Sequence, residues 1–454
     1  ILRERKSRLY QLKKMELVTI EGDKYDIRDI VIDFAYTESI DSPFIRCDFT
    51  ILDAIDFNKL LIGGEMINID LVTNSSGNKH LKTALRVFKI GSLIKQERGQ
   101  MYILHCTTPE SYPNEMNKVF KPFGPAGKDV DNIPKHICKE YLKASNEKTR
   151  DRNFETHSKI SFISTNWRPV EAIAYMSDKV TRVDGKGSGK ASKKQSGFLF
   201  WENRYGFNFK SLDALCKGEG IPKEEDIFEY TYQQQGADPP ANGAYIIESI
   251  SYPDRANHLR NMRMGTFKTT GLSISLPRPT NSNATDSGGS DKTSPAGTIH
   301  SPKEITFNQV FGKADTIHKR KPFDLPPDLA SFKGATRIKY RALPGMKNQA
   351  TKDDPDNGTD SDTDTMAVAE YAAARYNLLQ AIQLTIVVPG NSALTAGSLI
   401  KVRIPASQEK NRSVKEDLRY SGNYLISGVE HVFKAEGLTT KLVLTRDSVM
   451  KETY

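Results

Sequence analysis

The chain has 454 residues, of which 37% are hydrophobic and 27% are charged, and its formal net charge is +9. This length exceeds what one hydrophobic core usually serves, so it predicts two to four domains. The 65 Lys and Arg are mixed with 56 Asp and Glu along the sequence, which argues against a continuous nucleic-acid-binding stripe.

Residues 15–108 are predicted to form an antiparallel β domain. Apolar and polar side chains alternate from Ile30 to Tyr36 and again from Ile45 to Ile51. The composition of residues 38–43 favours a turn between these runs. Two later runs, LRVFKIGSLIKQ and QMYILHCTT, flank a glycine-containing turn at 97–99. We expect a first tube-like β-barrel here.

Residues 109–224 are predicted to form a smaller domain of helices and strands. One helix has Asp131 or Asn132 as a suitable N-cap and Pro134 in its first turn. A second helix is expected at about 166–180. The stretch GFLFWENRYGFNFKSLDAL then predicts an aromatic hairpin, which could stack the bases of single-stranded nucleic acid. Because only Arg204 and Lys210 supply positive charge there, we favour an aromatic core.

A second tube-like β-barrel is predicted from two separate segments, 225–276 and 366–448. The intervening residues 277–365 are predicted to be an inserted arm, because 277–300 and 351–365 have the composition of polar linkers. A helix from Met366 leads into four runs that alternate like half-buried strands. These runs are QLTIVVPGN, AGSLIKVRIP, SGNYLISGVEHVFK and LTTKLVLTRDS.

The two β domains carry a repeated segment. Residues 61–71 read LIGGEMINIDL and residues 394–404 read LTAGSLIKVRI, so that Gly64 falls on Gly397 and three apolar positions coincide. Both copies lead into a long strand, a glycine turn and a final strand. The agreement of element order on both sides of the match favours a duplicated domain over a chance likeness of two amphipathic strands.

Arg375 lies in the middle of the apolar arc of the helix from Met366. Most such arginines lay their methylene groups on apolar surface and extend to solvent. The alternative is a charge-assisted contact to a carboxylate across a subunit interface.

Neither a catalytic site, a metal site nor a cofactor site is predicted. The acidic run from Asp353 to Asp364 places Pro355 at a ligand position of a calcium loop and the shorter Asp364 where Glu is expected. The basic run 184–197 fails the phosphate-loop pattern at two positions. The four cysteines have neither zinc nor disulfide spacing, and no apolar run is long enough to cross a membrane. We therefore expect folding in a reducing cytoplasm.

The chain resembles the central hub proteins of contractile phage tail baseplates, which are related to the hub portion of type VI secretion spike proteins. The resemblance rests on the order of GFLFWENRYGFNFKSLD, ARYNLLQAIQLTIVVPGNSALTAGSLIKVRIP, YSGNYLISGVEHVF and LVLTRDS, and it covers about residues 15–448. None of these stretches is chemically diagnostic by itself.

The resemblance implies a homotrimer that joins a sixfold tail tube to a threefold central spike. The implied partners are the spike, a tube or tube-initiator protein and baseplate wedge proteins, with DNA only as passing cargo. The implied location is the virion tail, after assembly in the host cytoplasm. Candidate lumen or interface residues are Asn68, Asp70, Arg375, Lys401 and Arg403. Two other functions stay open, a tail-associated cell-wall hydrolase and a single-stranded nucleic-acid-binding barrel.

Overall fold

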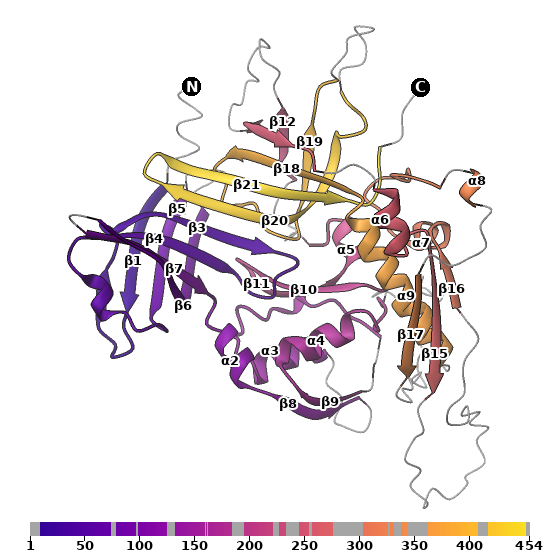
Figure 1. The fold of residues 1–454 in the computed structure, drawn as a ribbon, viewed down its shortest axis with the longest axis horizontal. Coiled ribbons are helices and arrows are strands. Elements are labelled where there is room, and N and C mark those ends of the chain that lie inside the picture. The colour runs from indigo at the N-terminus through magenta and orange to yellow at the C-terminus, as the bar shows by residue number, and fades with distance from the viewer. Residues whose placement is uncertain are drawn as a thin grey trace, which may run out of the picture.

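The computed structural model describes most of the chain. The described residues are 10–73, 79–96, 99–124, 132–158, 160, 162–183, 195–220, 227–232, 245–253, 257–275, 303–325, 327–330, 337–343, 362–406 and 416–450. Strands dominate the fold, with helices gathered in two smaller regions (Figure 1). The predicted mainly β fold with α+β parts is confirmed.

The first β half contains seven strands that surround one core. They are β1 (Tyr10–Val18), β2 (Lys24–Asp26), β3 (Val31–Ser39), β4 (Arg46–Asp53), β5 (Met66–Thr73), β6 (Lys79–Gln96) and β7 (Gly99–Thr107). A short 3-10 helix, η1 (Phe57–Leu60), precedes β5. The spatial order is β3-β4-β7-β6-β5-β1-β2, with antiparallel neighbours throughout. Inward residues such as Phe49, Ile67 and Leu85 are fully buried.

The second β half also contains seven strands. They are β12 (Glu229–Tyr232), β13 (Ile246–Ile247), β14 (Ser249–Ser251), β18 (Ile382–Pro389), β19 (Leu399–Arg403), β20 (Gly422–Lys434) and β21 (Gly437–Arg446). Their order, β14-β18-β21-β20-β19-β12-β13, repeats that of the first half strand for strand. The polarity of one strand differs: β12 runs parallel to β19, whereas β1 runs antiparallel to β5.

In each half, one run of chain connects the two ends of the sheet. β2 pairs with β1, and the chain continues within a few residues into β3, which pairs with β4. In the same way β13 pairs with β12 and leads through Glu248 into β14, which pairs with β18. Among the described residues, neither half has a ladder that runs all the way round. Each half is therefore a rolled sheet whose ends are joined by a bend of the chain.

The two halves share one continuous hydrogen-bonded sheet. Residues Gly428–Lys434 of β20 pair antiparallel with Ser39–Asp33 of β3. Figure 1 shows β20 and β3 side by side where the halves meet. Phe433 from β20 stacks on Phe34 with 4.4 Å between ring centroids, so the second half contributes to the core of the first.

The α+β region lies between the halves in sequence and has its own core. It contains α2 (Ser111–Met116), β8 (Val119–Phe123), α3 (Ile133–Glu140), η2 (Asp151–Asn153), β9 (Phe162–Trp167), α4 (Pro169–Ser177), β10 (Phe198–Asn203), β11 (Gly206–Ser211) and α5 (Leu212–Cys216). Asn132 caps α3 by accepting from Lys135 N, as predicted. Four aromatic residues of the β10–β11 hairpin, Phe198, Trp201, Phe207 and Phe209, are buried, so this hairpin is core and does not present a base-stacking surface.

A third region is inserted between β14 and β18. It contains α6 (His258–Arg263), β15 (Lys268–Ser275), β16 (Lys303–Thr306), α7 (Phe307–Lys313), α8 (Pro327–Ala330), β17 (Arg337–Leu343) and α9 (Asp362–Leu379). The sequence placed 268–275 and the helix in the second β-barrel. In the structure β15 pairs with β16 and β17 instead, and α9 packs on this small sheet through Tyr371, Ala374 and Leu378. The linkers 277–300 and 351–361 lie outside the described residues.

Candidate functional site

The repeated segment has the same backbone geometry in both halves. Gly64 and Gly397 have φ angles of 99° and 88°, which a residue with a Cβ rarely adopts. Gly64 N donates to Val87 O, and Val87 N donates back to Glu65 O. Gly397 N donates to Ile426 O, and Ile426 N donates back to Ser398 O. The two glycines therefore begin equivalent strands against equivalent partners.

A bulge follows at the same place in each half. The ladder between β6 and β7 shifts register between Val87 and Lys89, and the ladder between β20 and β21 shifts between Ile426 and Gly428. Bulges bend a strand locally and are specific features of a fold. Their coincidence directly after the matched residues Val87 and Ile426 is strong structural evidence for the duplication expected from the sequence.

Asn68 and Asp70 lie on the outward face of β5, opposite the buried Ile67 and Ile69. Asp70 is 3.6 Å from His80 on the neighbouring β6, and the two form an ion pair only when the histidine is protonated. The predicted face is thus partly exposed and available to a neighbour or to a lumen.

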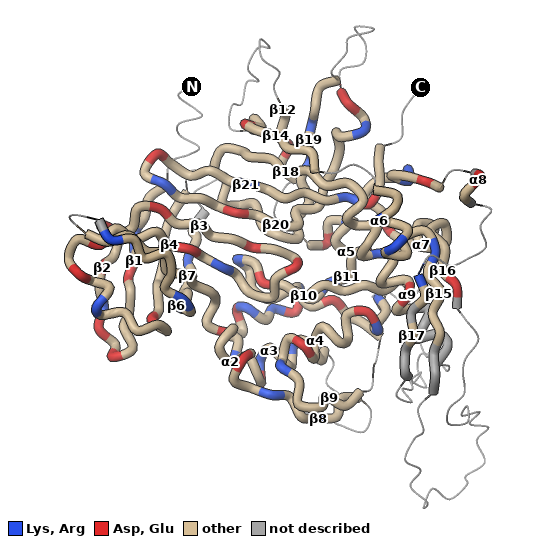
Figure 2. The backbone as a smooth tube through the Cα atoms, in the orientation of Figure 1, with Lys and Arg blue, Asp and Glu red and all other residues tan. Residues whose placement is uncertain are grey.

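Lys401 and Arg403 occupy the equivalent positions on β19, and the structure brings them together on one carboxylate. Lys401 Nζ lies 2.8 Å and Arg403 Nε 2.5 Å from Glu229 on β12. These two contacts hold the pKa of Glu229 below its usual value, chiefly through the hydrogen bond from Lys401. Figure 2 shows basic and acidic residues interspersed along the chain. The outward faces of β5 and β19 differ in charge, because Asp70 stands in the first half where Arg403 stands in the second.

Arg375 is not a lumen or interface residue, which corrects the prediction. Its side chain is 0% exposed and forms ion pairs inside the chain, with Asp447 at 2.7 Å and Asp213 at 3.5 Å. The carboxylates come from α5 and from the residue that follows β21. A helical pattern cannot identify such partners, because they lie about 70 and 160 positions away in the sequence.

The tip of the β10–β11 hairpin joins three parts of the molecule. Glu38 of β3 accepts from Arg204 N (2.7 Å), Ala396 N (3.0 Å) and Tyr36 Oη (2.9 Å). The Arg204 guanidinium donates to the carbonyl groups of Ser392 and His80, one from each half. Burial raises the pKa of Glu38 to about 7, against these hydrogen bonds, which favour its charged form.

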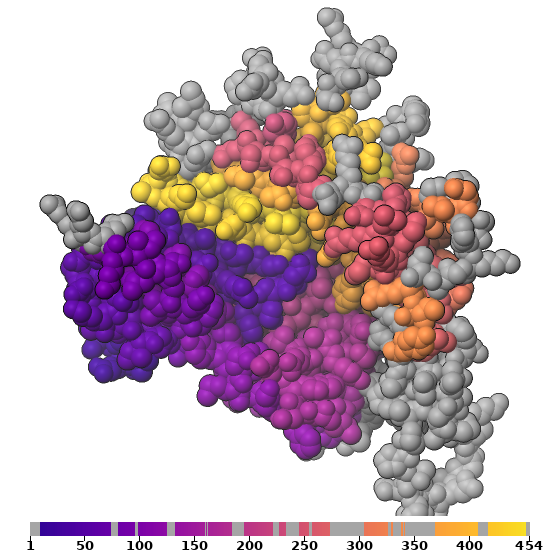
Figure 3. Space-filling view, in the orientation of Figure 1, coloured from indigo at the N-terminus to yellow at the C-terminus, as the bar shows by residue number. Residues whose placement is uncertain are grey.

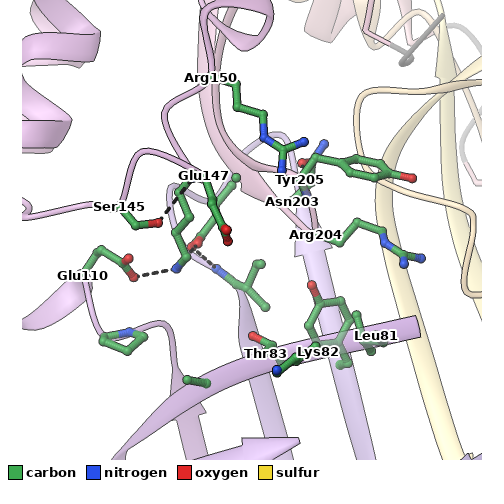
Figure 4. A pocket seen from close by; sticks show the side chains of 17 residues that line it. Leu81, Lys82, Thr83, Glu110, Ser145, Glu147, Arg150, Asn203, Arg204 and Tyr205 are labelled. Carbon is green, nitrogen blue, oxygen red and sulfur yellow. Dashed lines mark hydrogen bonds and ion pairs between the residues drawn. The ribbon is translucent and has the colours of Figure 1, made fainter. Parts of the chain in front are cut away.

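A pocket of about 310 Å³ opens beside this junction (Figure 4). Leu81, Lys82 and Thr83 of β6 form one wall, and Arg204 and Tyr205 of the hairpin form another. Deeper in, Lys148 Nζ bridges Glu202 at 2.8 Å and Glu110 at 2.7 Å.

Glu110 and Glu202 of this pocket are engaged in ion pairs within the chain. Glu202 also accepts from Thr108 Oγ1 at 2.6 Å, and burial raises its pKa while Lys148 opposes that effect. A general acid or base needs access to a substrate proton. Lys148 of the same α+β region and Thr108 at the end of the first half both bind Glu202, so this carboxylate is engaged in joining the two regions.

Neither metal nor thiol chemistry is suggested by the described residues. No three of their His, Cys, Asp or Glu side chains are grouped so as to hold a metal ion. All four cysteines are buried and unpaired, and burial raises their pKa values well above the usual one. No helix within the described ranges is both long and apolar enough to span a membrane.

The junction residues Glu38 and Glu202 were missed by sequence reasoning. Glu38 stands in a turn-like run and Glu202 in the middle of the aromatic hairpin. The only available signal was a carboxylate surrounded by apolar and aromatic residues, which requires a partner if it is buried.

No protein-family model matches the chain, and no curated protein matches it in sequence. Solved structures do match at low identity. A tail protein from Neisseria meningitidis MC58 is 8% identical, with a TM-score of 0.49 over 97% of this chain and 99% of that one. The 43 kDa tail protein of prophage MuSo2 from Shewanella oneidensis is 10% identical, with a TM-score of 0.47 over 96% and 99%. A type VI secretion system component of E. coli is 8% identical, with a TM-score of 0.38 over 96% and 76%.

Proposed function

We propose that the chain is a structural hub of a contractile-tail baseplate. Three copies form a ring that joins a sixfold tail tube to a threefold central spike and lines part of the lumen. The protein acts by assembly and not by catalysis. Its partners are two further copies, the spike, a tube or tube-initiator protein and wedge proteins, and DNA is only passing cargo. It resides in the virion tail after assembly in the host cytoplasm.

The duplicated β half is the observation that carries this proposal. Seven strands recur in one spatial order, with the same glycine and the same bulge. Identical chains in a closed ring have equivalent environments. Three chains with two similar halves each therefore offer six similar positions, whereas the inserted region between β14 and β18 appears only three times. Such a ring matches sixfold and threefold partners at once.

Asn68, Asp70, Lys401 and Arg403 are the candidates to line the lumen or to meet neighbouring chains. They occupy matched outward positions in the two halves. A permanent contact between chains is expected to bury about 2,000 Å² or more.

The proposal is tested by the mass of the purified protein at micromolar concentration and by averaged electron-microscope views down the assembly axis. We expect three chains, with three strong outer features and six weaker inner lobes. A monodisperse monomer that forms no ring in particles would overturn the proposal. Salt-dependent binding to single-stranded DNA or a clear zone in a peptidoglycan zymogram would then support the respective alternative.

A further inference from the structure

One edge of β20 has two successive partners. Its first part, Gly422–Leu425, pairs with β19. After the bulge at Ser427, the same edge pairs with β3 of the other half, because β21 occupies the opposite edge along Leu425–Lys434. The ladder to β3 covers this part of β20, and none of its residues from Gly428 to Phe433 is in the exposed class.

The equivalent edge of β6 has only the first of these partners. Its first part, Lys79–Arg86, pairs with β5, and the opposite edge pairs with β7 along Arg86–Gln96. Beyond the bulge at Phe88, no described strand pairs with the β5 side of β6. Phe88, Leu93 and Ile94 are 49%, 50% and 50% exposed there. An open strand edge with exposed apolar side chains is a template for pairing with another chain.

The strand equivalent to β3 is β14, and its second edge is also open. β14 pairs with β18, as β3 pairs with β4, and no other described strand pairs with it. Paired residues on neighbouring strands connect Ala35 through Asp48 and His105 to Lys89, and Ser251 through Thr385 and Val443 to Gly428. Lys89 and Gly428 are each the first residue after the matched bulge. Ala35 therefore corresponds to Ser251, and Tyr36 corresponds to Tyr252.

We propose that β6 of one copy pairs antiparallel with β14 of a second copy, as β20 pairs with β3 inside one chain. This inference rests on the proposed ring and specifies its contact. The sheet that runs through both halves of one chain would then continue into the next chain. The contact is head-to-tail, so it closes into a ring only when the rotation between copies permits.

The side chains at the two edges suit this pairing. The β6 edge carries the exposed Lys89 and Lys95 beside its exposed apolar residues. Ile250 and the 43% exposed Tyr252 offer apolar surface. Figure 3 shows the corresponding contact already made within the chain, where the yellow β20–β21 hairpin packs on the indigo first half.

The test is a cysteine pair placed across the proposed contact. The β6–β7 ladder shifts register a second time between Gly91 and Ile94, so positions near the hairpin are counted from its end. From the end pairs Gln96–Gly99 and Lys434–Gly437, Ile94 corresponds to Val432, which lies opposite Ala35. Ile94→Cys with Ser251→Cys should therefore link chains to one another on mild oxidation and give a covalent trimer on a non-reducing gel. The matched control, Ala35→Cys with Val432→Cys, should link within one chain and migrate as a monomer.

The outcomes separate this inference from the proposed function. A mixture of the two single variants, Ile94→Cys and Ser251→Cys, should give covalent dimers that involve both variants. If the mass measurement finds a ring of three but the double variant yields no link between chains, the strand pairing is wrong and the hub remains. If the unmodified protein is a monomer, the proposed function fails as well.

A second variant tests the same edge without cross-linking. Ile94→Glu places a charge on the exposed β6 edge and should raise the concentration needed for assembly by about tenfold or more. Ile163→Glu is the control, because Ile163 is a 62% exposed strand residue on β9. It should change assembly by less than about twofold. Equal effects of the two variants would overturn the inference.

Discussion

β6 and β20 are the same element of two copies of one fold, but they end in different surroundings. Both follow a strand that starts at a left-handed glycine, both carry a bulge at the same place and both form a hairpin with the next strand. Beyond the bulge, β20 is covered by β3, whereas the matching edge of β6 is half exposed. The repeated segment thus gives both strands the same backbone shape. Whether the strand edge is exposed depends on whether another strand of the chain pairs with it.

The difference extends to how each half is supported. The end of β21 is held by the buried ion pair of Arg375 and Asp447, and the start of β19 is packed against Trp201. At the corresponding start of β5, a Cβ on Gly64 would have only Ile20 Cδ1 within 4 Å. The second half is therefore supported by other parts of the same chain, and the first half keeps more of its surface for contacts outside it.

The largest expected effect comes from removing the support of β21. Arg375→Met should lower the free energy of unfolding by about 3–5 kcal/mol, because Asp447 and Asp213 would stay buried without their cation. Arg403→Met, which removes a 43% exposed partner of Glu229, should cost about 0–1 kcal/mol. Urea unfolding of both variants checks this, and a similar loss in the two would contradict it.

The two glycines provide a matched pair of substitutions. Gly64→Ala and Gly397→Ala should each cost about 1–2 kcal/mol, because both positions have left-handed φ angles. At Gly397 the new Cβ would also lie 2.5 Å from Trp201 Cζ2, which adds about 1–3 kcal/mol of overpacking. Near Gly64 the nearest atom is Ile20 Cδ1 at 3.9 Å. Equal midpoints in denaturant would show that the second half is not packed more tightly here.

The covered edge of β20 should also produce a pH dependence. Burial lowers the pKa of His431 to about 4, where its ring contacts Thr440 Oγ1 and Leu394 O. The folded-state pKa is below the unfolded value of about 6.5, so the unfolded chain binds more protons between these values. The contribution of His431 to stability should therefore fall by about 1–3 kcal/mol as the pH falls from about 6.5 to 4. The raised pKa of Glu38 acts in the opposite direction over this range, so the effect of His431 has to be measured as a difference between variants.

His431→Gln is the variant that isolates this effect, because glutamine does not titrate in this range. Unfolding free energies measured from pH 7 to pH 4 should decline less for His431→Gln than for the unmodified chain. Parallel declines would assign the acid sensitivity to other groups.

The smallest effect on folding is expected at the matched outward faces. Reversing Lys401 and Arg403 together to Glu should change the free energy of unfolding by only about 1 kcal/mol, because both side chains are partly exposed. Assembly or passage through the lumen should nevertheless weaken. Lys441→Glu, at a 51% exposed position on β21, is the control, and equal assembly of the two variants would remove these residues from the contact.

Much of the β architecture could be predicted from alternation alone. Ile400, Val402 and Ile404 are buried as expected, and the left-handed glycines stand where the repeated segment placed them. The alternation failed at Ile32, which is 45% exposed because the β3–β4 ladder shifts register between Val31 and Asp33. A bulge reverses the face of a residue without changing the residue pattern.

The junction and the buried ion pairs could not be predicted in this way. Glu38 contacts Ala396, and Arg375 contacts Asp213 and Asp447, so the partners come from segments far apart in sequence. Alternation identifies which face of an element is buried but not which element covers it. For the same reason, the pattern of β15 did not reveal that it pairs with β16 and β17.

The ladder between β3 and β20 has a consequence for synthesis of the protein. Its two strands are about 390 positions apart in the chain, so β3 leaves the ribosome long before β20 is made. At about 5–20 residues per second, the interval is on the order of tens of seconds. During this time the nascent first half has no β20 to cover its β3 edge and lacks Phe433 in its core. The N-terminal half can therefore be completed only near the end of translation. Until then, nascent chains on the same mRNA can mispair through the uncovered edge of β3.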